Sequence, residues 1–487
     1  MRDYVCALDA GTTGVRAIAV DGAGCPFAHR YREFTQYFPR PGWVEHDAAE
    51  ITEAIRDVTA ELIAELGSPP LAFGITNQRE TIVAWDRRTG EPLHRAIVWQ
   101  DRRGAARCEQ LRADHYELIR TTTGLVPDPY FSATKLEWLF TEGGISPDET
   151  VAVGTIDTWL VWCLTGGAVH ATEPSNASRT MLFDISTMGW SATLCDLFGV
   201  PREVLPEVMA TAGRFGTTRG VAGIPDGIPI SGIAGDQQAA LFGQACFEPG
   251  MAKNTYGTGS FVLMNVGRAV PDATDGLLTT VAWQLAGEEA VYAVEGSIFS
   301  TGSAVQWLRD GLGIIGAADE LEGLAATCDD AGGVVLVPAF TGLGAPWWDP
   351  SARGTIVGLT RGTGRAQLAR AVIDAMVFQT RDVIDAMVAS TDRTLTELRV
   401  DGGAAVMDLL CQAQADQLAT PVVRAVDVET TALGAAFLAG LAEGFWDGPA
   451  GISALLGEGT RFEPATAPDD EAFARWHRAV QRARAFA

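Results

Sequence analysis

Near the start of the chain, two apolar segments are separated by a short polar segment, which is a pattern typical of paired strands. Two apolar runs within Tyr4–Asp21 flank the short polar link Gly11-Thr12-Thr13-Gly14. Apolar runs around a glycine-bounded link predict a β-hairpin. Ala252–Gly267 repeats this order of strand, Gly-Thr link and strand. Two such hairpins about one domain-length apart predict a duplicated fold with one hairpin in each half.

Helices are predicted between and after the two hairpins. Apolar residues at helical spacing indicate a helix over Ala48–Leu66 and a long amphipathic helix over Arg365–Val388. We also expect a helix over Gly296–Leu312 and a last surface helix within Phe462–Ala487. Short buried strands, such as Pro70–Ile75, alternate with these segments, which is typical of an α/β protein.

The chain is too long for one hydrophobic core. Its 487 residues, 47% of them hydrophobic, are enough for two large domains. We place the junction at Glu248-Pro249-Gly250. The expected division is an N-terminal domain over residues 1–247, a C-terminal domain over residues 248–445, and a helical tail over residues 446–487.

Charge and composition exclude several classes of partner. A formal net charge of −25 argues against nucleic acid or an anionic membrane as the main partner. No window approaches 18 uninterrupted apolar residues, and we find no signal-peptide pattern. The eight cysteines are scattered without C-x-x-C spacing, which is typical of reduced thiols. We therefore expect a cytoplasmic protein without integral membrane association.

Positive charge comes almost entirely from arginine. Lys135 and Lys253 are the only lysines, and neither lies in a G-x-x-x-x-G-K-[ST] phosphate loop. The V-A-I-K and D-F-G elements of protein kinases are also missing. A nucleotide would therefore have to be bound by another architecture.

The first hairpin is the candidate phosphate site. Its backbone N–H groups and the hydroxyls of Thr12 and Thr13 can converge on an anion. Asp9 ends the first strand, where a carboxylate could hold Mg²⁺, and Arg16 adds positive charge from the second strand. The alternative is a plain hairpin with an aspartate near its turn.

Polar residues that follow buried strands are candidates for ligand binding, because ligands of α/β sheets lie at strand carboxyl ends. Arg79 and Glu80 follow one strand and could give a small polyol both donors and acceptors. The alternative is a surface ion pair. Asp236 follows another strand and precedes a predicted helix, so it is a candidate N-cap and a candidate general base for an alcohol. Both roles are compatible in one residue.

Several long stretches carry a family resemblance. They are Gly42–Asp47, Gly74–Thr81, Ile97–Gln100, Asp128–Lys135, Ser175–Phe183, Ile230–Gln244, Gly250–Gly259 and Pro338–Pro346, together with two signature segments, Tyr130–Glu142 and Gly354–Asp374. On these stretches the chain resembles the FGGY carbohydrate kinases over nearly its whole length, and within them the branch that phosphorylates glycerol.

The resemblance implies a fold and a reaction. It implies two actin-like (ribonuclease-H-like) α/β domains facing each other across an interdomain cleft. It also implies MgATP-dependent phosphorylation of glycerol to sn-glycerol 3-phosphate and ADP, in glycerol catabolism. We expect a homo-oligomer of two or four copies.

The resemblance further implies roles for individual residues. Hydrogen bonds to glycerol would come from Arg79, Glu80, Tyr130, Asp236 and Gln237, and an apolar wall from Trp99 and Phe261, with Asp236 as the base. The phosphates would meet Thr12, Thr13, Gly14, Arg16 and Thr258; the rest of the nucleotide would meet Gly302, Gln306, Gly403 and Ala404; Mg²⁺ would lie near Asp9 and Asp236.

The chain departs from the family pattern at four places. Gly14 stands where many relatives have serine, so one contact to phosphate is missing. Met407 and Asp408 replace a pair of asparagines near the adenosine, which leaves nucleotide preference open. Gly220–Gly227 lacks the arginine of a loop that binds fructose 1,6-bisphosphate, and Ala212–Phe215 contains no regulatory histidine. We therefore expect neither inhibition by the bisphosphate nor activation by histidine phosphorylation.

Two alternatives stay open at this point. One is a kinase of the same family acting on a larger polyol or ketose, although the pocket implied by Trp99, Tyr130 and Phe261 is small. The other is an actin-like nucleotide switch without catalysis, which the presence of Asp236 and the Arg79-Glu80 pair disfavours. Phosphorylation of glycerol and of xylulose distinguishes these possibilities.

Overall fold

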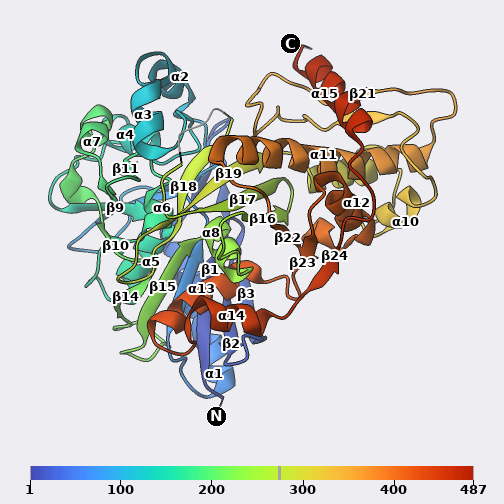
Figure 1. The fold of residues 1–487 in the computed structure, drawn as a ribbon. Coiled ribbons are helices and arrows are strands. Elements are labelled where there is room, and N and C mark those ends of the chain that lie inside the picture. Colours follow the sequence, from blue (N-terminus) through green and yellow to red (C-terminus); the bar gives the residue numbers. More distant parts are fainter. Residues whose placement is uncertain (1, 272–275, 486–487) are drawn as a thin grey trace.

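The computed structural model describes residues 2–271 and 276–485 and contains two large β-sheets, one in each half of the chain (Figure 1). The first has the strand order β14-β15-β6-β1-β2-β3, and the second the order β18-β19-β17-β16-β22-β23-β24. The strands of the first sheet are β1 (Tyr4–Ala10), β2 (Gly14–Asp21), β3 (Pro26–Glu33), β6 (Phe73–Asn77), β14 (Ala212–Thr217) and β15 (Pro229–Gly235). Those of the second are β16 (Met251–Tyr256), β17 (Ser260–Gly267), β18 (Leu278–Trp283), β19 (Val291–Ile298), β22 (Glu397–Gly402), β23 (Val422–Arg424) and β24 (Thr460–Phe462).

Both predicted hairpins are present. Strands β1 and β2 pair in antiparallel register with Asp9 opposite Arg16, and β16 and β17 pair in the same way with Tyr256 opposite Ser260. Each hairpin also has a parallel neighbour on its first strand, β6 for β1 and β22 for β16. The two halves therefore repeat one arrangement, as the sequence predicted.

Smaller elements surround these sheets. A five-stranded sheet consists of β4 (Gln36–Tyr37), β5 (Glu45–His46), β8 (Ala96–Ile97), β7 (Ile82–Asp86) and β9 (Val151–Thr155). Short strand pairs are β10 (Ala171–Thr172) with β13 (Glu207–Val208), β11 (Phe183–Asp184) with β12 (Gly189–Trp190), and β20 (Val335–Val337) with β21 (Thr355–Val357). The helices before the second sheet are α1 (Ala48–Leu66), α2 (Ala105–Asp114), α3 (Tyr116–Thr123), α4 (Ala133–Thr141), α5 (Ile156–Leu164), α6 (Pro174–Ala177), α7 (Ala192–Phe198) and α8 (Asp236–Gly243). Those after its first strands are α9 (Gly302–Gln306), α10 (Glu320–Ala325), α11 (Arg365–Thr391), α12 (Asp408–Leu418), α13 (Thr430–Ala442), α14 (Gly448–Leu456) and α15 (Asp470–Arg484).

Helix α1 has the predicted bounds because its ends carry strong local signals. The Asp47 side chain accepts hydrogen bonds from the N–H groups of Ala49 and Glu50, which caps the start of the helix. Gly67 ends it in the left-handed conformation, where glycine is favoured (φ 69°). Between these caps, the apolar face of α1 packs on β2 and β3.

Helix α13 comes late in the chain but packs on the first sheet. Figure 1 shows its orange ribbon beside the blue and green strands, and it contacts β1, β6 and β15. It also crosses α8 very closely: a Cβ atom on Gly434 would lie 1.9 Å from the Ala239 carbonyl oxygen, and one on Gly243 would lie 1.9 Å from the Thr430 carbonyl oxygen. Glycine is therefore required at this crossing, which joins the two halves in one core.

Two predicted segments differ in the structure. Strand β19 continues to Ile298, so only the later part of Gly296–Leu312 is helical, as α9 and a π-helical turn over Trp307–Gly311. Residues 446–487 are not purely helical, because β24 joins the edge of the second sheet. Helix α15 also buries one face: Trp476 is fully buried, and its Nε1 donates to Asp382 Oδ2 at 2.7 Å. The polar residues of this segment suggested a surface helix. The sequence did not identify Asp382 as the partner of Trp476.

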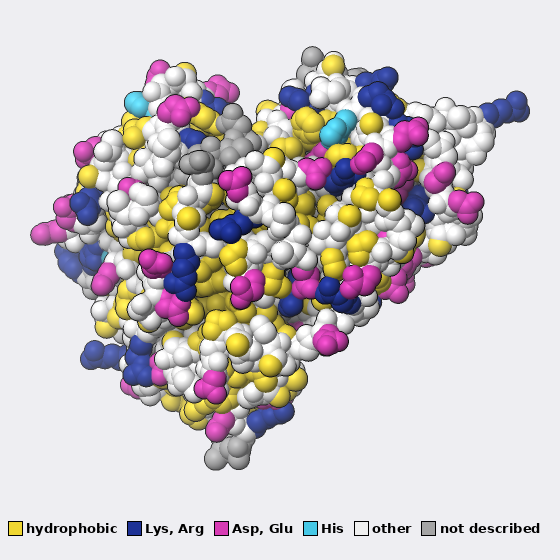
Figure 2. Space-filling view, in the orientation of Figure 1, with side chains coloured by type: hydrophobic (Ala, Val, Ile, Leu, Met, Phe, Trp, Pro, Cys, Tyr) yellow, Lys and Arg dark blue, Asp and Glu magenta, His cyan; other side chains and the backbone are white. Residues whose placement is uncertain are grey.

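No helix in the part of the chain that the structure describes is both long and apolar enough to cross a membrane. Figure 2 shows acidic and basic side chains mixed over one face of the molecule.

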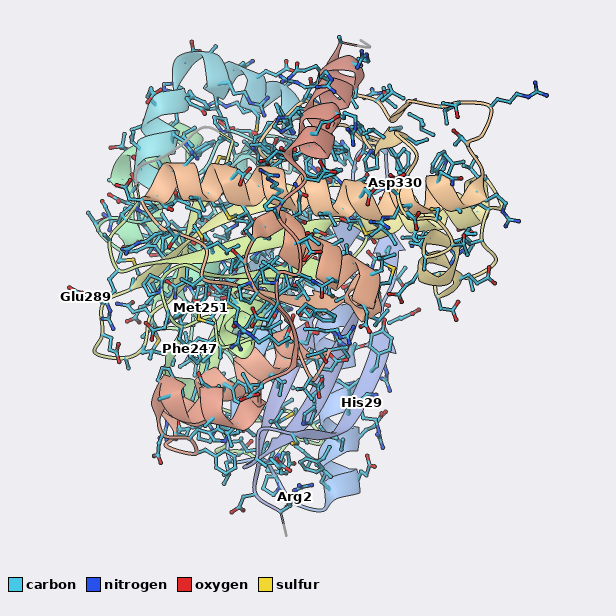
Figure 3. All side chains as sticks on the ribbon, turned by 45° about the vertical axis from the view of Figure 1, so that its right-hand side comes forward. Arg2, His29, Phe247, Met251, Glu289 and Asp330 are labelled. Atoms are coloured by element: carbon cyan, nitrogen blue, oxygen red, sulfur yellow. The ribbon has the colours of Figure 1, made fainter. Side chains whose placement is uncertain are left out.

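Phe247 and Met251, which flank the predicted junction, lie near each other in Figure 3, and both pack against the core shared by the two halves.

Candidate active site

Three parallel strands of the first sheet end side by side at one edge. Ala10 on β1 lies opposite Asn77 on β6, which in turn lies opposite Gly235 on β15. The segments that leave these ends carry the first hairpin link, the Arg79-Glu80 pair and Asp236. The three candidate segments therefore meet where ligands of α/β sheets bind.

Asp236 is the first residue of α8, and the cap position belongs to Gly235. The N-cap interpretation was therefore wrong by one residue. Asp236 Oδ1 accepts a hydrogen bond from the Gln237 N–H at 2.7 Å and lies 3.3 Å from Arg79 Nε. Oδ2 has no hydrogen bond to any described residue. Burial raises the pKa of Asp236, although Arg79 and Lys253 oppose this. The free oxygen of a carboxylate with a raised pKa can accept a proton from an alcohol.

Arg79 and Glu80 are not a surface ion pair, because they are only 2% and 1% exposed. Arg79 Nη1 lies 2.6 Å from Glu295 Oε2. Arg179 joins the two carboxylates: its Nε donates to Glu80 Oε1 at 2.7 Å, and its Nη2 donates to Glu295 Oε1 at 3.0 Å. Two arginines and two glutamates from both halves of the chain thus form a buried, charge-balanced cluster beside Asp236.

Glu80 also has an unusual backbone. Its φ of 62° is in the left-handed region, which is unfavourable for a side chain larger than asparagine. The Glu80 carbonyl accepts a hydrogen bond from Ser132 Oγ at 3.0 Å, and its carboxylate is held by Arg179. These two hydrogen bonds hold Glu80 at both its backbone and its side chain, and strained residues of this kind are concentrated at functional sites.

Aromatic residues connect the cluster to the first hairpin. Arg79 Nη2 donates to the Tyr130 hydroxyl at 3.3 Å, and the rings of Tyr130 and Trp99 meet edge to face with centroids 5.5 Å apart. Trp99 Nε1 donates to Thr12 Oγ1 at 3.0 Å. Phe261, on β17, is partly buried against the core shared by the two halves. The structure therefore joins Trp99 directly to the hairpin and Tyr130 to it through Trp99, and it places Phe261 on the opposite half.

Lys135 fixes the loop that carries Tyr130. Its Nζ donates to the carbonyl oxygens of Pro129 at 2.7 Å, Tyr130 at 2.7 Å and Phe131 at 2.9 Å. Burial lowers the pKa of Lys135 to about 8. Three carbonyl partners match the three donors of an ammonium group.

We expect Lys135→Met to destabilise the protein and to loosen the Tyr130 loop. Methionine fills a similar volume but leaves three carbonyl groups without this donor, at roughly 1–3 kcal/mol for each buried group that stays unpaired. Urea unfolding measures the loss of stability, and the KM for a substrate that contacts Tyr130 should rise more than kcat falls. Wild-type stability and KM would contradict this role.

Lys253, the other lysine, is also fully buried at the site. Its Nζ donates to Gln237 Oε1 at 2.5 Å and to Thr255 Oγ1 at 3.0 Å, so it connects the second sheet to the residue after Asp236. Burial lowers its pKa to about 8, although Asp401 and Asp236 favour the charged form.

The site therefore includes Arg179, Lys253 and Glu295, which the sequence did not single out. Two signals were present. Lysine occurs only twice in the chain, and Glu295 is a lone charge within the apolar strand β19.

An open cleft of about 760 Å³ extends from the first hairpin. Its lining includes Asp9, Gly11, Thr13, Gly14, Arg16, Tyr31, Asp427 and Glu429. Arg16 crosses the cleft: Nη2 lies 2.8 Å from Asp9 Oδ2, and Nη1 lies 2.5 Å from Glu429 Oε2 in the second half of the chain. The hairpin thus has the Arg16 guanidinium beside an open volume, which favours an anion there.

The second hairpin supports the start of α9. The N–H of Gly302 donates to the Gly257 carbonyl at 3.0 Å, and the N–H of Ser303 donates to the Thr258 carbonyl at 3.0 Å. A Cβ atom on Gly302 would lie 2.5 Å from the Gly257 carbonyl oxygen, so glycine permits this contact. The exposed Gln306 ends the same helix. Thr258, Gly302 and Gln306 therefore lie on connected elements.

Gly403 and Ala404 follow the neighbouring strand β22, in the 3-10 turn Gly403–Val406. Gly402 lies opposite Tyr256, so this turn is at the same edge of the sheet as the second hairpin. A Cβ atom on Gly403 would have no neighbour within 4 Å, which leaves open space against the backbone.

The carboxylates fit a Mg²⁺ ion that arrives with a nucleotide. Within the described residues no group of three or more His, Cys, Asp or Glu side chains is arranged to hold a metal. Mg²⁺ in nucleotide sites needs only one or two carboxylates, because phosphates and waters supply the other oxygens. Burial and, less strongly, Asp236 raise the pKa of Asp9, so these two carboxylates are close enough to interact. Asp9 Oδ1 has no hydrogen bond to a described residue.

Comparison with known proteins gives consistent results. Similar curated proteins include the glycerol kinase of Dechloromonas aromatica, 54% identical over 98% of this chain and 97% of the relative. Glycerol kinase 2 of Thermotoga maritima is 52% identical over 98% of both chains. The crystal structure of Plasmodium falciparum glycerol kinase with ADP is 35% identical, with a TM-score of 0.94 over 99% of this chain and 98% of that chain.

More distant structures share the fold alone. A gluconate kinase from Lactobacillus acidophilus has a TM-score of 0.88 at 21% identity, over 99% of this chain and 97% of that chain. The prediction of two actin-like α/β domains is confirmed. The model of the FGGY family of carbohydrate kinases, N-terminal domain, matches residues 4–243, and that of the C-terminal domain matches residues 252–443. The chain belongs to the FGGY family of carbohydrate kinases.

Proposed function

We propose that this protein transfers the terminal phosphoryl group of MgATP to a terminal hydroxyl of glycerol, giving sn-glycerol 3-phosphate and ADP. The observation that supports this most strongly is the position of Asp236. Its Oδ1 lies 3.3 Å from Arg79 Nε, and its carboxylate is close enough to Asp9, at the start of the phosphate hairpin, to raise the pKa of Asp9. The curated relatives that match almost the whole chain are named glycerol kinases, which supports the choice of substrate.

In this proposal the polar cluster binds and orients the polyol. Arg79, Tyr130 and Gln237 offer donors and acceptors around Asp236, and Glu80 is held by Arg179 in a fixed orientation. Trp99 and Phe261 supply apolar surface for the carbon chain. Asp236 Oδ2 accepts the hydroxyl proton while the oxygen forms a bond to phosphorus and the bond from phosphorus to the leaving nucleotide oxygen breaks. Phosphoryl transfer depends mainly on such positioning and on charge neutralisation.

The nucleotide would lie in the open cleft. The first hairpin, with Thr12, Thr13, Gly14 and Arg16, and Thr258 of the second hairpin would meet its phosphates. Gly302, Gln306, Gly403 and Ala404 would line its remaining part. Bound Mg²⁺ would neutralise phosphate charge beside Asp9 and Asp236. Closure of the two halves would keep water from competing with the alcohol.

A coupled assay of ADP release tests the substrate. We expect turnover with glycerol, almost none without an alcohol, and a kcat/KM for xylulose lower by about 100-fold or more, because extra carbons clash with a small aromatic pocket. Equal rates with xylulose would favour a kinase of larger polyols or ketoses. ATP binding without turnover of either compound would favour a nucleotide switch. Cytoplasmic location and assembly into two or four copies stay predictions.

A further inference from the structure

Gly14 is closely covered by the neighbouring strand β3. Its φ is not among the positive values that favour glycine, so the need for glycine here is steric. A Cβ atom at Gly14 would lie 2.6 Å from the Tyr31 hydroxyl oxygen, 2.7 Å from Tyr31 Cε2 and 2.8 Å from the Arg32 carbonyl oxygen. Real Cβ atoms essentially never make contacts this short. The Tyr31 phenol and the Arg32 backbone therefore occupy the space that any larger residue at position 14 would need.

Tyr31 is on the same face of the sheet as the candidate phosphate site. Asp9 on β1 lies opposite Arg16 on β2, and Arg16 lies opposite Tyr31 on the edge strand β3. Directly opposed residues have side chains on one face of a sheet. All three line the open cleft, as does His29, which precedes Tyr31 by two residues on β3 and is labelled in Figure 3.

The Tyr31 hydroxyl is available to a ligand. Tyr31 is 50% exposed, and its hydroxyl makes no hydrogen bond within the described residues. Arg16, the cation beside it, is already paired with Asp9 and Glu429. A phenol can donate its proton to an anionic oxygen without adding charge.

We propose that Tyr31 is a phosphate-binding residue whose hydroxyl, held over Gly14, donates a hydrogen bond to the polyphosphate of the bound nucleotide. The sequence suggested that Gly14 costs the hairpin a side-chain contact. The structure assigns that contact to the adjacent strand instead. This inference rests on the proposed function only in taking ATP as the phosphoryl donor.

Tyr31→Phe tests the hydroxyl and keeps the ring. We expect the Kd for ADP, measured by titration calorimetry, and the KM for ATP to rise about 10- to 100-fold, the range for a hydrogen bond to a charged group. Since the contact is present before and during transfer, kcat and the KM for glycerol at saturating ATP should change little. Tyr37→Phe, on β4 under the Arg95 guanidinium, is the matched control and should bind ADP like the wild type.

Two further substitutions test the same contact. Tyr31→Ala should weaken ADP binding at least as much as Tyr31→Phe, because it also lacks the hydroxyl. Gly14→Ser should weaken it too, because the new Cβ overlaps both the Tyr31 ring and the Arg32 carbonyl oxygen. Wild-type ADP affinity in Tyr31→Phe or in Tyr31→Ala would overturn the proposal. A wild-type protein that binds ADP but does not phosphorylate glycerol would overturn the proposed function instead.

Discussion

Asp236→Asn is expected to reduce kcat for glycerol phosphorylation by about 10²–10⁴-fold, the usual contribution of a general base, or roughly 3–5 kcal/mol of barrier. Asparagine has the same shape and can still accept the Gln237 N–H bond, so the fold should be unchanged. It cannot take a proton from the substrate. The hairpins, Arg16 and bound Mg²⁺ would still position the phosphoryl group, which is why residual activity should persist. Steady-state kinetics at saturating ATP measure the effect.

The pH profile separates a base from a merely structural carboxylate. Because burial raises the pKa of Asp236, kcat/KM of the wild type should rise with pH through that pKa as the carboxylate ionises. This acidic limb should be absent in Asp236→Asn. Asp310→Asn removes an exposed carboxylate whose partner is the neighbouring Arg309, and should leave both rate and profile unchanged. Near-normal turnover in Asp236→Asn would exclude the proposed base.

Local sequence signals were sufficient for individual elements. Helix α1 could be predicted to the residue because Asp47 and Gly67 mark its ends, and both hairpins because glycines bound their links. The segment of helix α13 could be recognised as apolar, but the sequence could not show which sheet it packs on. It is buried on nearly all sides, so no apolar stripe indicates a single partner. Its packing on the first sheet depends on glycines at a crossing that only the structure shows.

The candidate site was predictable where polar residues follow buried strands, as at Arg79 and Asp236. It was not predictable where the charge partners are distant. Glu295 pairs with Arg79 across 216 positions, and Arg179 joins Glu80 across 99. Such pairs leave no spacing pattern in a single sequence. Arg79 and Glu80 could be interpreted as a surface ion pair for the same reason, because the sequence does not show which distant residues cover them.

Glu295→Gln is expected to destabilise the folded protein by about 3–5 kcal/mol, the cost of breaking a buried ion pair from one side. Glu295 is fully buried and is shared by the guanidinium groups of Arg79 and Arg179. Glutamine has nearly the same size but leaves two buried positive charges balanced only by Glu80 and Asp236. Arg79 should move toward Asp236, so the KM for glycerol should also rise. Urea unfolding and steady-state kinetics measure the two effects.

The pH dependence of stability gives an independent check. Burial alone would raise the pKa of Glu295, but Arg179 and Arg79 lower it to about 2. In the unfolded chain glutamate has a pKa of about 4.3. The pairing therefore stabilises the folded protein fully above about pH 5, and this contribution is lost as the pH falls toward 2. The free energies of unfolding of the wild type and of Glu295→Gln should therefore become more similar in acid. Glu288→Gln removes an exposed partner of Arg268 and should cost less than about 1 kcal/mol. If Glu295→Gln proved no more costly than this control at neutral pH, the buried cluster would not be what holds the two halves together at the site.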